Sequence, residues 1–326
     1  MTEIASTDRN GFIDLPRELE DDLIEIARTL PAWSVDGSFL TGTTIERYRD
    51  GLVSAPLFDG VRDALLSTLN NAAGGYAVVR LGRIAQALGV GDQFLRLATA
   101  ILAEVAIPFQ PFRRWPLWKS IGTDLGAKPG LSTGVGYNAF HMDLVNATEP
   151  PDYTTLLCVR PDPLGEGASI LSHAREAVSR LAPFSRGLLR DTAYTYGGFF
   201  ELSDVGEKYT PFPVLDGQPE DRGFVRFTAK MLAESGLDEE HAYAARELAR
   251  QMVAGQVSYT LQRGDLLILD QHRWVHGRLP LGDGQHRVTP GNRRLLLQLF
   301  LRNPDSIGRA TSQAVRTQVR PSLAEG

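Results

Sequence analysis

Three short segments in the middle of the chain have the length and apolar content of β-strands: Gly136-Tyr137-Asn138-Ala139-Phe140-His141-Met142-Asp143, Tyr153-Thr154-Thr155-Leu156-Leu157-Cys158-Val159 and Ala168-Ser169-Ile170-Leu171-Ser172. Apolar or alternating runs of roughly four to eight residues between turn-forming segments are typical of strands. Similar runs predict further strands at 76–81, 257–261, 265–269 and 295–302. The middle and the last part of the sequence are therefore predicted to build a β-core.

Helical periodicity marks other parts of the sequence. Apolar residues at helical spacing predict helices over 16–30, 57–70, 92–106 and 173–181, and over 227–253 with a break at Gly236. Strands and helices do not alternate regularly, so we expect a mainly β fold with helices (α+β), an antiparallel core with helices packed outside. A single domain is expected over 1–326, with helical support and first strands in 1–130, the core in 131–302, an inserted helical lid at about 182–256 and a polar tail in 303–326.

The composition favours a globular protein with a small-molecule substrate. Of its 326 residues, 43% are hydrophobic and 22% are charged, and the formal net charge is -5. Without a run of Lys and Arg there is no basic stripe for a nucleic acid, and no apolar stretch is long enough for a membrane span. The first thirty residues lack a basic segment followed by an apolar one, so a cytoplasmic protein is expected.

A group of metal-binding residues is predicted at the first of the quoted strands. On a strand, His141 and Asp143 point to the same face while Met142 points away. A third ligand then has to come from a distant segment. His276 is the best candidate, because it follows the apolar strand 265–269 and has a glycine beside it that permits close approach. Two histidines and one carboxylate form the facial triad of non-haem iron(II) oxygenases.

A wider pattern surrounds these ligands. It comprises Phe140-His141-Met142-Asp143, Pro151-Asp152-Tyr153 leading into Leu156-Leu157-Cys158, Gly165-Glu166-Gly167-Ala168-Ser169, and Gly264-Asp265-Leu266-Leu267 together with His276-Gly277-Arg278. On these residues the chain resembles the clavaminate synthase and taurine dioxygenase superfamily of Fe(II)- and 2-oxoglutarate-dependent oxygenases. The resemblance implies a double-stranded β-helix, or jelly roll, and a reaction that consumes 2-oxoglutarate and O2.

The same resemblance implies a co-substrate site. Arg294 matches the family position whose cation binds the far carboxylate of 2-oxoglutarate, and it lies eighteen residues after His276. An arginine can hold a carboxylate through two parallel hydrogen bonds. Ser169 stands where the family usually has a threonine that shares this carboxylate, and the serine keeps the hydroxyl. Because Asp143 is the carboxylate that halogenating relatives lack, hydroxylation or a related C–H oxidation is expected.

The resemblance also bears on the class of the primary substrate. The resemblance is strongest to members that oxidise amino acids or peptide-derived intermediates, such as cyclic dipeptides, in natural-product biosynthesis. Candidate polar contacts to the substrate are Asn146, Glu149, Asp152 and Arg226, because they follow the metal ligands or border the predicted lid. No catalytic side chain is expected beyond the metal ligands.

Three other interpretations fit parts of the pattern. The stretch Gly130-Leu131-Ser132-Thr133-Gly134 matches the G-x-S-x-G of serine hydrolases, but a nucleophile elbow needs a strand before it and a helix after it, and this context is not predicted. A zinc hydrolase with the same three ligands would leave Arg294 and Ser169 without a role. A jelly-roll binding module without catalysis would bury polar groups unpaired, at about 1 to 3 kcal/mol each.

Overall fold

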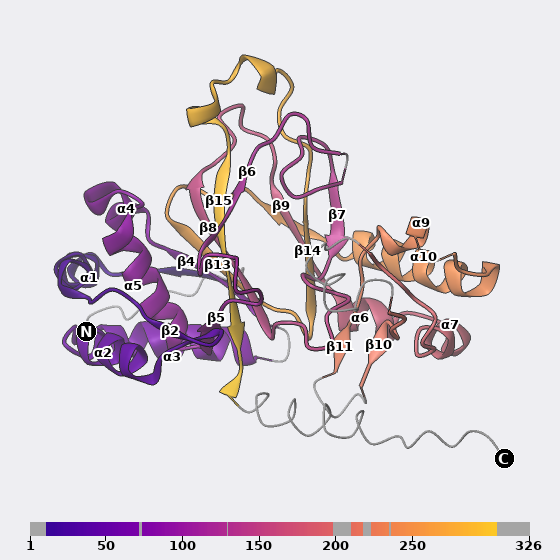
Figure 1. Cartoon of the computed structure of the whole chain (residues 1–326), viewed down its shortest axis with the longest axis horizontal. Coiled ribbons are helices and arrows are strands. Elements are labelled where there is room, and N and C mark those ends of the chain that lie inside the picture. The colour runs from indigo at the N-terminus through magenta and orange to yellow at the C-terminus, as the bar shows by residue number, and fades with distance from the viewer. Residues whose placement is uncertain are drawn as a thin grey trace.

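The computed structural model describes residues 11–71, 74–128, 130–197, 210–217, 223–234 and 236–304. Within these ranges, a large sheet and a small sheet face each other in the middle of the molecule, and helices cover the outer side of each sheet (Figure 1). The predicted α+β class with a β-core and outer helices is confirmed.

The large sheet combines strands from both ends of the described chain. Its order is β1 (Phe12–Asp14), β4 (Tyr76–Arg80), β13 (Asp265–Asp270), β8 (Tyr153–Arg160), β15 (Leu295–Arg302), β5 (Ile107–Phe109), β3 (Phe39–Leu40) and β2 (Val35–Asp36), with β6 (Lys119–Gly122) also paired to β15. Neighbouring strands are antiparallel, whereas β1 runs parallel to β4. The strands predicted at 76–81, 153–159, 265–269 and 295–302 are confirmed.

The small sheet carries both of the predicted histidine ligands. Its order is β12 (Val257–Tyr259), β9 (Ser169–His173), β14 (Trp274–Arg278) and β7 (Asn138–His141), with antiparallel pairs throughout the described strands. The strands predicted at 168–172 and 257–261 are confirmed as β9 and β12. β14 is an additional strand that the sequence pattern does not separate from the segment before it.

Alternation along the strands builds the layers of the molecule. On β13, Leu266 and Ile268 pack toward the N-terminal helices, while Leu267 and Leu269 point toward the small sheet. The same inter-sheet layer contains Trp274 from β14. Both faces of β13 are therefore buried, which explains its unbroken apolar run.

Helices from the N-terminal part cover the outer face of the large sheet. They are α1 (Arg17–Thr29), α2 (Gly42–Val53), α3 (Phe58–Asn70), α4 (Gly82–Leu88) and α5 (Asp92–Ala103). The predictions at 16–30, 57–70 and 92–106 are confirmed as α1, α3 and α5. The pattern misses α2, because its buried face combines Leu52 with Thr44 and Tyr48 and has a weak apolar period.

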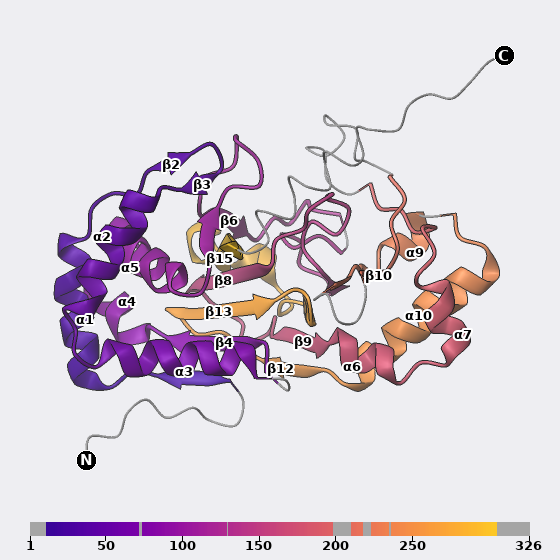
Figure 2. The ribbon, with the colours of Figure 1, turned by 90° about the horizontal axis from the view of Figure 1, so that it is seen from below.

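The described parts of the chain between β9 and β12 pack on the outer face of the small sheet (Figure 2). This part contains α6 (Ala174–Ser179), α7 (Pro183–Leu188), β10 (Leu215–Asp216), β11 (Phe224–Val225), α9 (Met231–Glu234) and α10 (Glu239–Ala254). The predicted helix at 173–181 is confirmed as α6. No helix in the described ranges has the length and apolar content needed to cross a membrane.

The helical stretch predicted at 227–253 begins too early. Thr228 forms a β-bridge with His141, so the chain is extended there and the first helix starts at Met231. The predicted break at Gly236 is confirmed, because this residue has a positive φ of 58° and lies between α9 and α10. The beginning of the insertion is thus held against the strand that carries His141.

Helix packing on the large sheet leads to a prediction for stability. Leu65 of α3 is 1% exposed in the core of this layer. Leu65→Ala is expected to lower the free energy of unfolding by about 2–5 kcal/mol, because burial is lost and a cavity remains. Leu131, which is 41% exposed, is the control, and Leu131→Ala is expected to change the free energy of unfolding by less than about 0.5 kcal/mol. Urea denaturation measures the free energy of unfolding of both variants. Equal effects of Leu65→Ala and Leu131→Ala would contradict the packing of α3 on the large sheet.

Candidate active site

His141, Asp143 and His276 meet in the space between the two sheets. Their ligand atoms all lie within 4.8 Å of one another. Asp143 Oδ1 is 3.9 Å from His141 Nε2, and Asp143 Oδ2 is 3.5 Å from His276 Nε2. Two imidazoles and a carboxylate at these distances can bind one divalent metal ion from one side and leave its other side open.

Strand pairing brings the two histidines together. In the small sheet, His276 of β14 is the register partner of His141 of β7. Gly277 permits this approach, since a Cβ there would lie 2.6 Å from the backbone oxygen of Asn138. The sequence predicts His276 in the segment that follows the strand 265–269, but in the structure it lies inside a further strand, β14. Its position opposite His141 therefore depends on a strand that was not predicted.

A turn, and not a strand, positions Asp143. β7 ends at His141, so the strand predicted over 136–143 is too long. The Met142 N–H donates to the Phe227 carbonyl, and Leu144 adopts a positive φ of 53° that turns the chain. The predicted convergence of His141 and Asp143 is found, but strand alternation is not its cause.

Hydrogen bonds from the large sheet fix the Asp143 carboxylate. Thr154 Oγ1 of β8 and Gln298 Nε2 of β15 donate to Oδ2 at 2.7 and 2.9 Å. The Asp143 N–H donates to Gln271 Oε1 at 2.7 Å, and Gln271 lies in the turn between β13 and β14. Oδ1 accepts no hydrogen bond from the described residues. The carboxylate thus links the two sheets and keeps one oxygen for a metal.

Burial sets the protonation state of the three ligands. Together with the neighbouring His276, it lowers the pKa of His141 to about 3, and it also lowers the pKa of His276. Burial by itself raises the pKa of the Asp143 carboxyl, but the two histidines, the Thr154 hydrogen bond and the Lys119 charge lower that pKa below its ordinary value. At neutral pH the site presents neutral imidazoles and a carboxylate, the forms that bind a metal.

A cavity opens beside the three ligands, and Arg294 and Ser169 line it. Arg294 is 9% exposed, and no described residue hydrogen-bonds or ion-pairs with its guanidinium. Burial, with the nearby Arg278, lowers the pKa of Arg294 to about 10, so it remains a cation at neutral pH. The structure therefore brings a cation and a hydroxyl into the same cavity as the three candidate ligands.

Arg278 also lines this cavity but is engaged with the backbone. Its Nη2 donates to the carbonyls of Gly134 and Gly136 at 2.6 and 2.7 Å. These carbonyls belong to the loop between β6 and β7. The G-x-S-x-G stretch lies in this same loop, which leads into a strand and not into a helix. The structure therefore lacks a nucleophile elbow at this stretch.

Asn146 and Arg226 hold the loop that follows Asp143. Arg226 forms an ion pair with Asp216 at 2.5 Å and donates to the carbonyls of Val145 and Ala147. Asn146 Nδ2 donates to the carbonyl of Tyr196 at 2.7 Å. Neither side chain is among the described residues that line the cavity. The structure therefore places these two predicted substrate contacts in the support of the loop.

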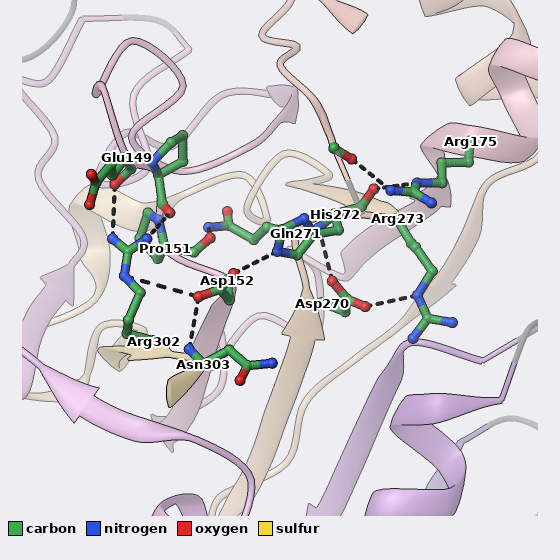
Figure 3. Close-up of polar contacts among 12 residues, drawn as sticks. Glu149, Pro151, Asp152, Arg175, Asp270, Gln271, His272, Arg273, Arg302 and Asn303 are labelled. Carbon is green, nitrogen blue, oxygen red and sulfur yellow. Dashed lines mark hydrogen bonds and ion pairs between the residues drawn. The ribbon is translucent and has the colours of Figure 1, made fainter. Parts of the chain in front are cut away.

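Asp152 and Glu149 belong to a polar network at the start of β8 (Figure 3). Asp152 accepts hydrogen bonds from His272 Nε2 at 2.6 Å and from the Asn303 N–H at 2.8 Å. Arg302 donates to the carbonyl of Glu149, whose side chain is exposed. Among the described residues, neither carboxylate lines the cavity. The network also includes His272, which lies four residues before His276 and is hydrogen-bonded to Asp152.

Several residues of the cavity lining were not predicted from the sequence: Trp115, Lys119, Asn138, Gln298 and Phe300. A signal for Gln298 is present, because it lies four residues after Arg294, an even spacing that puts two side chains on one face of an extended chain. Lys119 carries no such signal. Its place follows from the pairing of β6 with β15, where Lys119 is the register partner of Gln298.

A family model described as "Taurine catabolism dioxygenase TauD, TfdA family" matches residues 63–298, which include His141, Asp143, His276 and Arg294. The chain belongs to this family. The resemblance inferred from the sequence is therefore confirmed at the level of the superfamily, and so is the prediction of a dioxygenase.

Individual relatives of this TauD/TfdA chain support the same assignment. L-asparagine oxygenase of Streptomyces coelicolor is 28% identical over 287 residues, which are 86% of this chain and 76% of the relative. L-lysine 3-hydroxylase of Catenulispora acidiphila is 30% identical over 149 residues, which are 42% of this chain and 39% of the relative.

Solved structures share the fold of this TauD/TfdA chain. Asparagine oxygenase with Fe(II), 3-hydroxyasparagine and succinate has a TM-score of 0.71 at 22% identity, over 92% of this chain and 96% of that one. The non-haem iron oxygenase OrfP with Fe and α-ketoglutaric acid has a TM-score of 0.70 at 19% identity, over 94% and 96%. The predicted jelly-roll core is confirmed.

The Asp152 network predicts how stability changes with pH. Burial by itself raises the pKa of the Asp152 carboxyl, but the bonds from His272 and Asn303 lower it below its ordinary value. Such a group stabilises the fold above its unfolded pKa of about 3.9 and loses this contribution as the pH falls through the folded pKa. Asp152→Asn is therefore expected to lower stability at pH 7 and to flatten the loss below about pH 4.

Urea denaturation at a series of pH values measures this effect. The exposed Asp283 gives the matched control, and Asp283→Asn should keep the slope of the wild type in acid. An unchanged acid slope in Asp152→Asn would contradict the assignment of this stability to the Asp152 network.

Proposed function

We propose that this TauD/TfdA enzyme uses Fe(II), 2-oxoglutarate and O2, that His141, Asp143 and His276 bind the iron, and that Arg294 and Ser169 bind the far carboxylate of 2-oxoglutarate. Arg294 is the observation that carries the proposal. A buried cation that forms no direct ion pair with a counter-ion is unfavourable, and Asp162 acts on Arg294 only through its electrostatic field among the described residues. A dicarboxylate that reaches the metal with one end and Arg294 with the other supplies that counter-ion.

The donor set fits this metal. Two neutral imidazoles and one carboxylate are the ligands of non-haem iron sites with open positions. When bound, the iron couples the oxidative decarboxylation of 2-oxoglutarate to succinate and CO2 with the oxidation of a substrate C–H bond. A zinc hydrolase with the same ligands has no use for the buried guanidinium of Arg294.

The protein positions the Asp143 carboxylate and lines part of the cavity with apolar side chains that exclude water. Thr154 and Gln298 engage Oδ2 of Asp143, so Oδ1 would be the oxygen that remains to hold a metal. Leu156 and Leu296 line the cavity with apolar surface. This surface suits the methylene carbons of a co-substrate whose charged ends meet polar groups.

For the primary substrate we propose an amino acid, either free or within a peptide-derived intermediate such as a cyclic dipeptide in natural-product biosynthesis. In support, the relatives are named an L-asparagine oxygenase and an L-lysine 3-hydroxylase, and an OrfP structure contains (3S)-hydroxy-L-Arg. The retained Asp143 carboxylate favours hydroxylation. Asn146, Glu149, Asp152 and Arg226 act on this substrate indirectly, through the shape of the loop after Asp143.

Succinate formation from 2-oxoglutarate tests the co-substrate site. With Fe(II) and air, the purified wild type is expected to release succinate even without a primary substrate, and Arg294→Met should raise the KM for 2-oxoglutarate at least about 30-fold, because a buried charge-assisted pair is lost. Arg293→Met is the matched control from the neighbouring position and should leave this KM unchanged. A wild type that binds iron but forms no succinate with any amino acid would reopen the hydrolase and binding-module interpretations.

Iron affinity tests the support of Asp143. Gln298→Leu removes a hydrogen bond to Oδ2 and replaces the amide by an apolar side chain of similar size. It should weaken Fe(II) binding about 10- to 100-fold, as loss of a partner behind a metal ligand does. Anaerobic titration with a competing chelator measures the dissociation constant. Gln256→Leu on the exposed surface serves as the control, and equal affinities of the two variants would contradict the role of Gln298.

A further inference from the structure

The pairing of β7 with β14 contains a β-bulge beside the candidate metal centre. His141 lies opposite His276, and the register shifts before the next pair. In that next pair, Asn138 lies opposite Arg278. Three steps along β7 therefore match two steps along β14. An extra residue of this kind is a bulge, and bulges next to active sites often change the direction of a side chain.

The bulge turns Asn138 to the face that carries the metal ligands. By plain alternation, two side chains that are three residues apart on a strand point to opposite faces. His276 and Arg278 are two residues apart on β14, share a face and both line the cavity. Asn138, as the partner of Arg278, lies on this same face and also lines the cavity.

A hydrogen bond within the bulge orients the imidazole of His141. Its Nδ1 lies 2.9 Å from the carbonyl oxygen of Ala139. Because a carbonyl oxygen can only accept, Nδ1 carries the proton and Nε2 keeps its lone pair. Nε2 is the nitrogen that faces Asp143. The bulge therefore shapes the candidate metal centre and the lining beside it.

The side-chain amide of Asn138 has no hydrogen-bond partner within the described ranges. The residue is 4% exposed, and its Oδ1 is buried and accepts no hydrogen bond. None of the hydrogen bonds among the described residues involves its Nδ2. A buried polar group without a partner is unfavourable. A ligand in the cavity can supply the partner that the described part of the chain does not.

The place of Asn138 in the small sheet favours the primary substrate over 2-oxoglutarate. Asn138 of β7 and Ser169 of β9 are both register partners of Arg278, from its two sides. They are thus two strands apart, roughly 10 Å. In the proposed function, 2-oxoglutarate has partners at the metal and at Arg294 with Ser169. Asn138 therefore remains for a second ligand.

We propose that Asn138 is a specificity-determining residue that binds an amide group of the primary substrate. The inference rests on the proposed function. A primary amide presents an acceptor and a donor side by side, and a group with the same arrangement matches it with two hydrogen bonds. A carboxamide side chain and the cis amide of a cyclic dipeptide have this arrangement. A trans peptide bond does not, because its N–H and C=O point in opposite directions.

Binding measurements without turnover test this assignment. Each full-length protein is loaded with Ni(II) in place of iron and titrated by calorimetry, first with 2-oxoglutarate. With 2-oxoglutarate bound, the second titration uses L-asparagine, L-glutamine and the cyclic dipeptides of L-alanine, L-leucine, L-lysine and L-tyrosine. L-Aspartate, L-glutamate, L-lysine and L-arginine are the matched compounds without an amide.

Three variants of Asn138 separate its chemical properties. Asn138→Leu keeps the branching and removes both polar atoms, Asn138→Asp keeps the shape and replaces the donor, and Asn138→Ala adds no volume. Asn138→Ala carries the test if the leucine variant does not fold. Asn70→Leu makes the same chemical change on the exposed surface and is the matched control.

At least one compound with an amide is expected to bind the wild type. Its affinity should fall at least about tenfold in Asn138→Leu and in Asn138→Asp, as the loss of a hydrogen bond predicts. The affinity for 2-oxoglutarate should be unchanged, and Asn70→Leu should behave as the wild type. In urea, metal-free Asn138→Leu should unfold at a midpoint at or above that of the wild type, because an unpaired buried amide is removed.

Several results would overturn the role of Asn138. A lower urea midpoint of Asn138→Leu would indicate a structural role, and weaker binding of 2-oxoglutarate would assign the amide to the co-substrate. Tighter binding of an amine to Asn138→Asp would indicate an ammonium group in place of an amide. The substrate class is wrong if no compound with an amide binds a wild type that binds nickel and 2-oxoglutarate, or if one binds the wild type and Asn138→Leu equally. A wild type that binds neither nickel nor 2-oxoglutarate would instead contradict the proposed function itself.

Discussion

The pairing of β7 with β14 is the constraint on which the rest of the site depends. It sets His276 directly opposite His141, and it is possible only because Gly277 presents no Cβ to the backbone of Asn138. A shift of one residue in this register would turn an imidazole toward the outer apolar layer that contains Phe140 and Val275. The outer helices and the large sheet both stabilise this register.

The large sheet completes the geometry that the small sheet begins. Asp143 lies beyond the end of β7, so hydrogen bonds, and not strand geometry, fix its carboxylate. Thr154 and Gln298 reach it across the gap between the sheets, and Arg294 directly precedes β15, the strand of Gln298. The candidate carboxylate ligand and the cation proposed for the co-substrate thus both depend on β15 and on the residue directly before it.

Much of the fold and the centre of the site could be read from the sequence because their signals are local. Amphipathic helices and strands show in the spacing of apolar residues, and His141 with Asp143 is a short motif. The turn at Leu144 was missed because a leucine with positive φ has no sequence signature. Lys119 was missed because its place depends on strand pairing between distant segments. Asp152 was predicted as a substrate contact because its partners His272 and Asn303 are far away in sequence and give no local signal.

The sheet topology also fixes the order in which the site can form. β4 pairs with β13, and β15, the last described strand, supplies Gln298 and is directly preceded by Arg294. Pairings between such distant segments form late in folding, because the entropy of closing long loops is lost before the contacts stabilise the chain. On a ribosome, a nascent chain that has exposed only His141 and Asp143 therefore lacks both the second imidazole and the support of the carboxylate. The three candidate ligands therefore come together, with their support, only in chains that have finished folding.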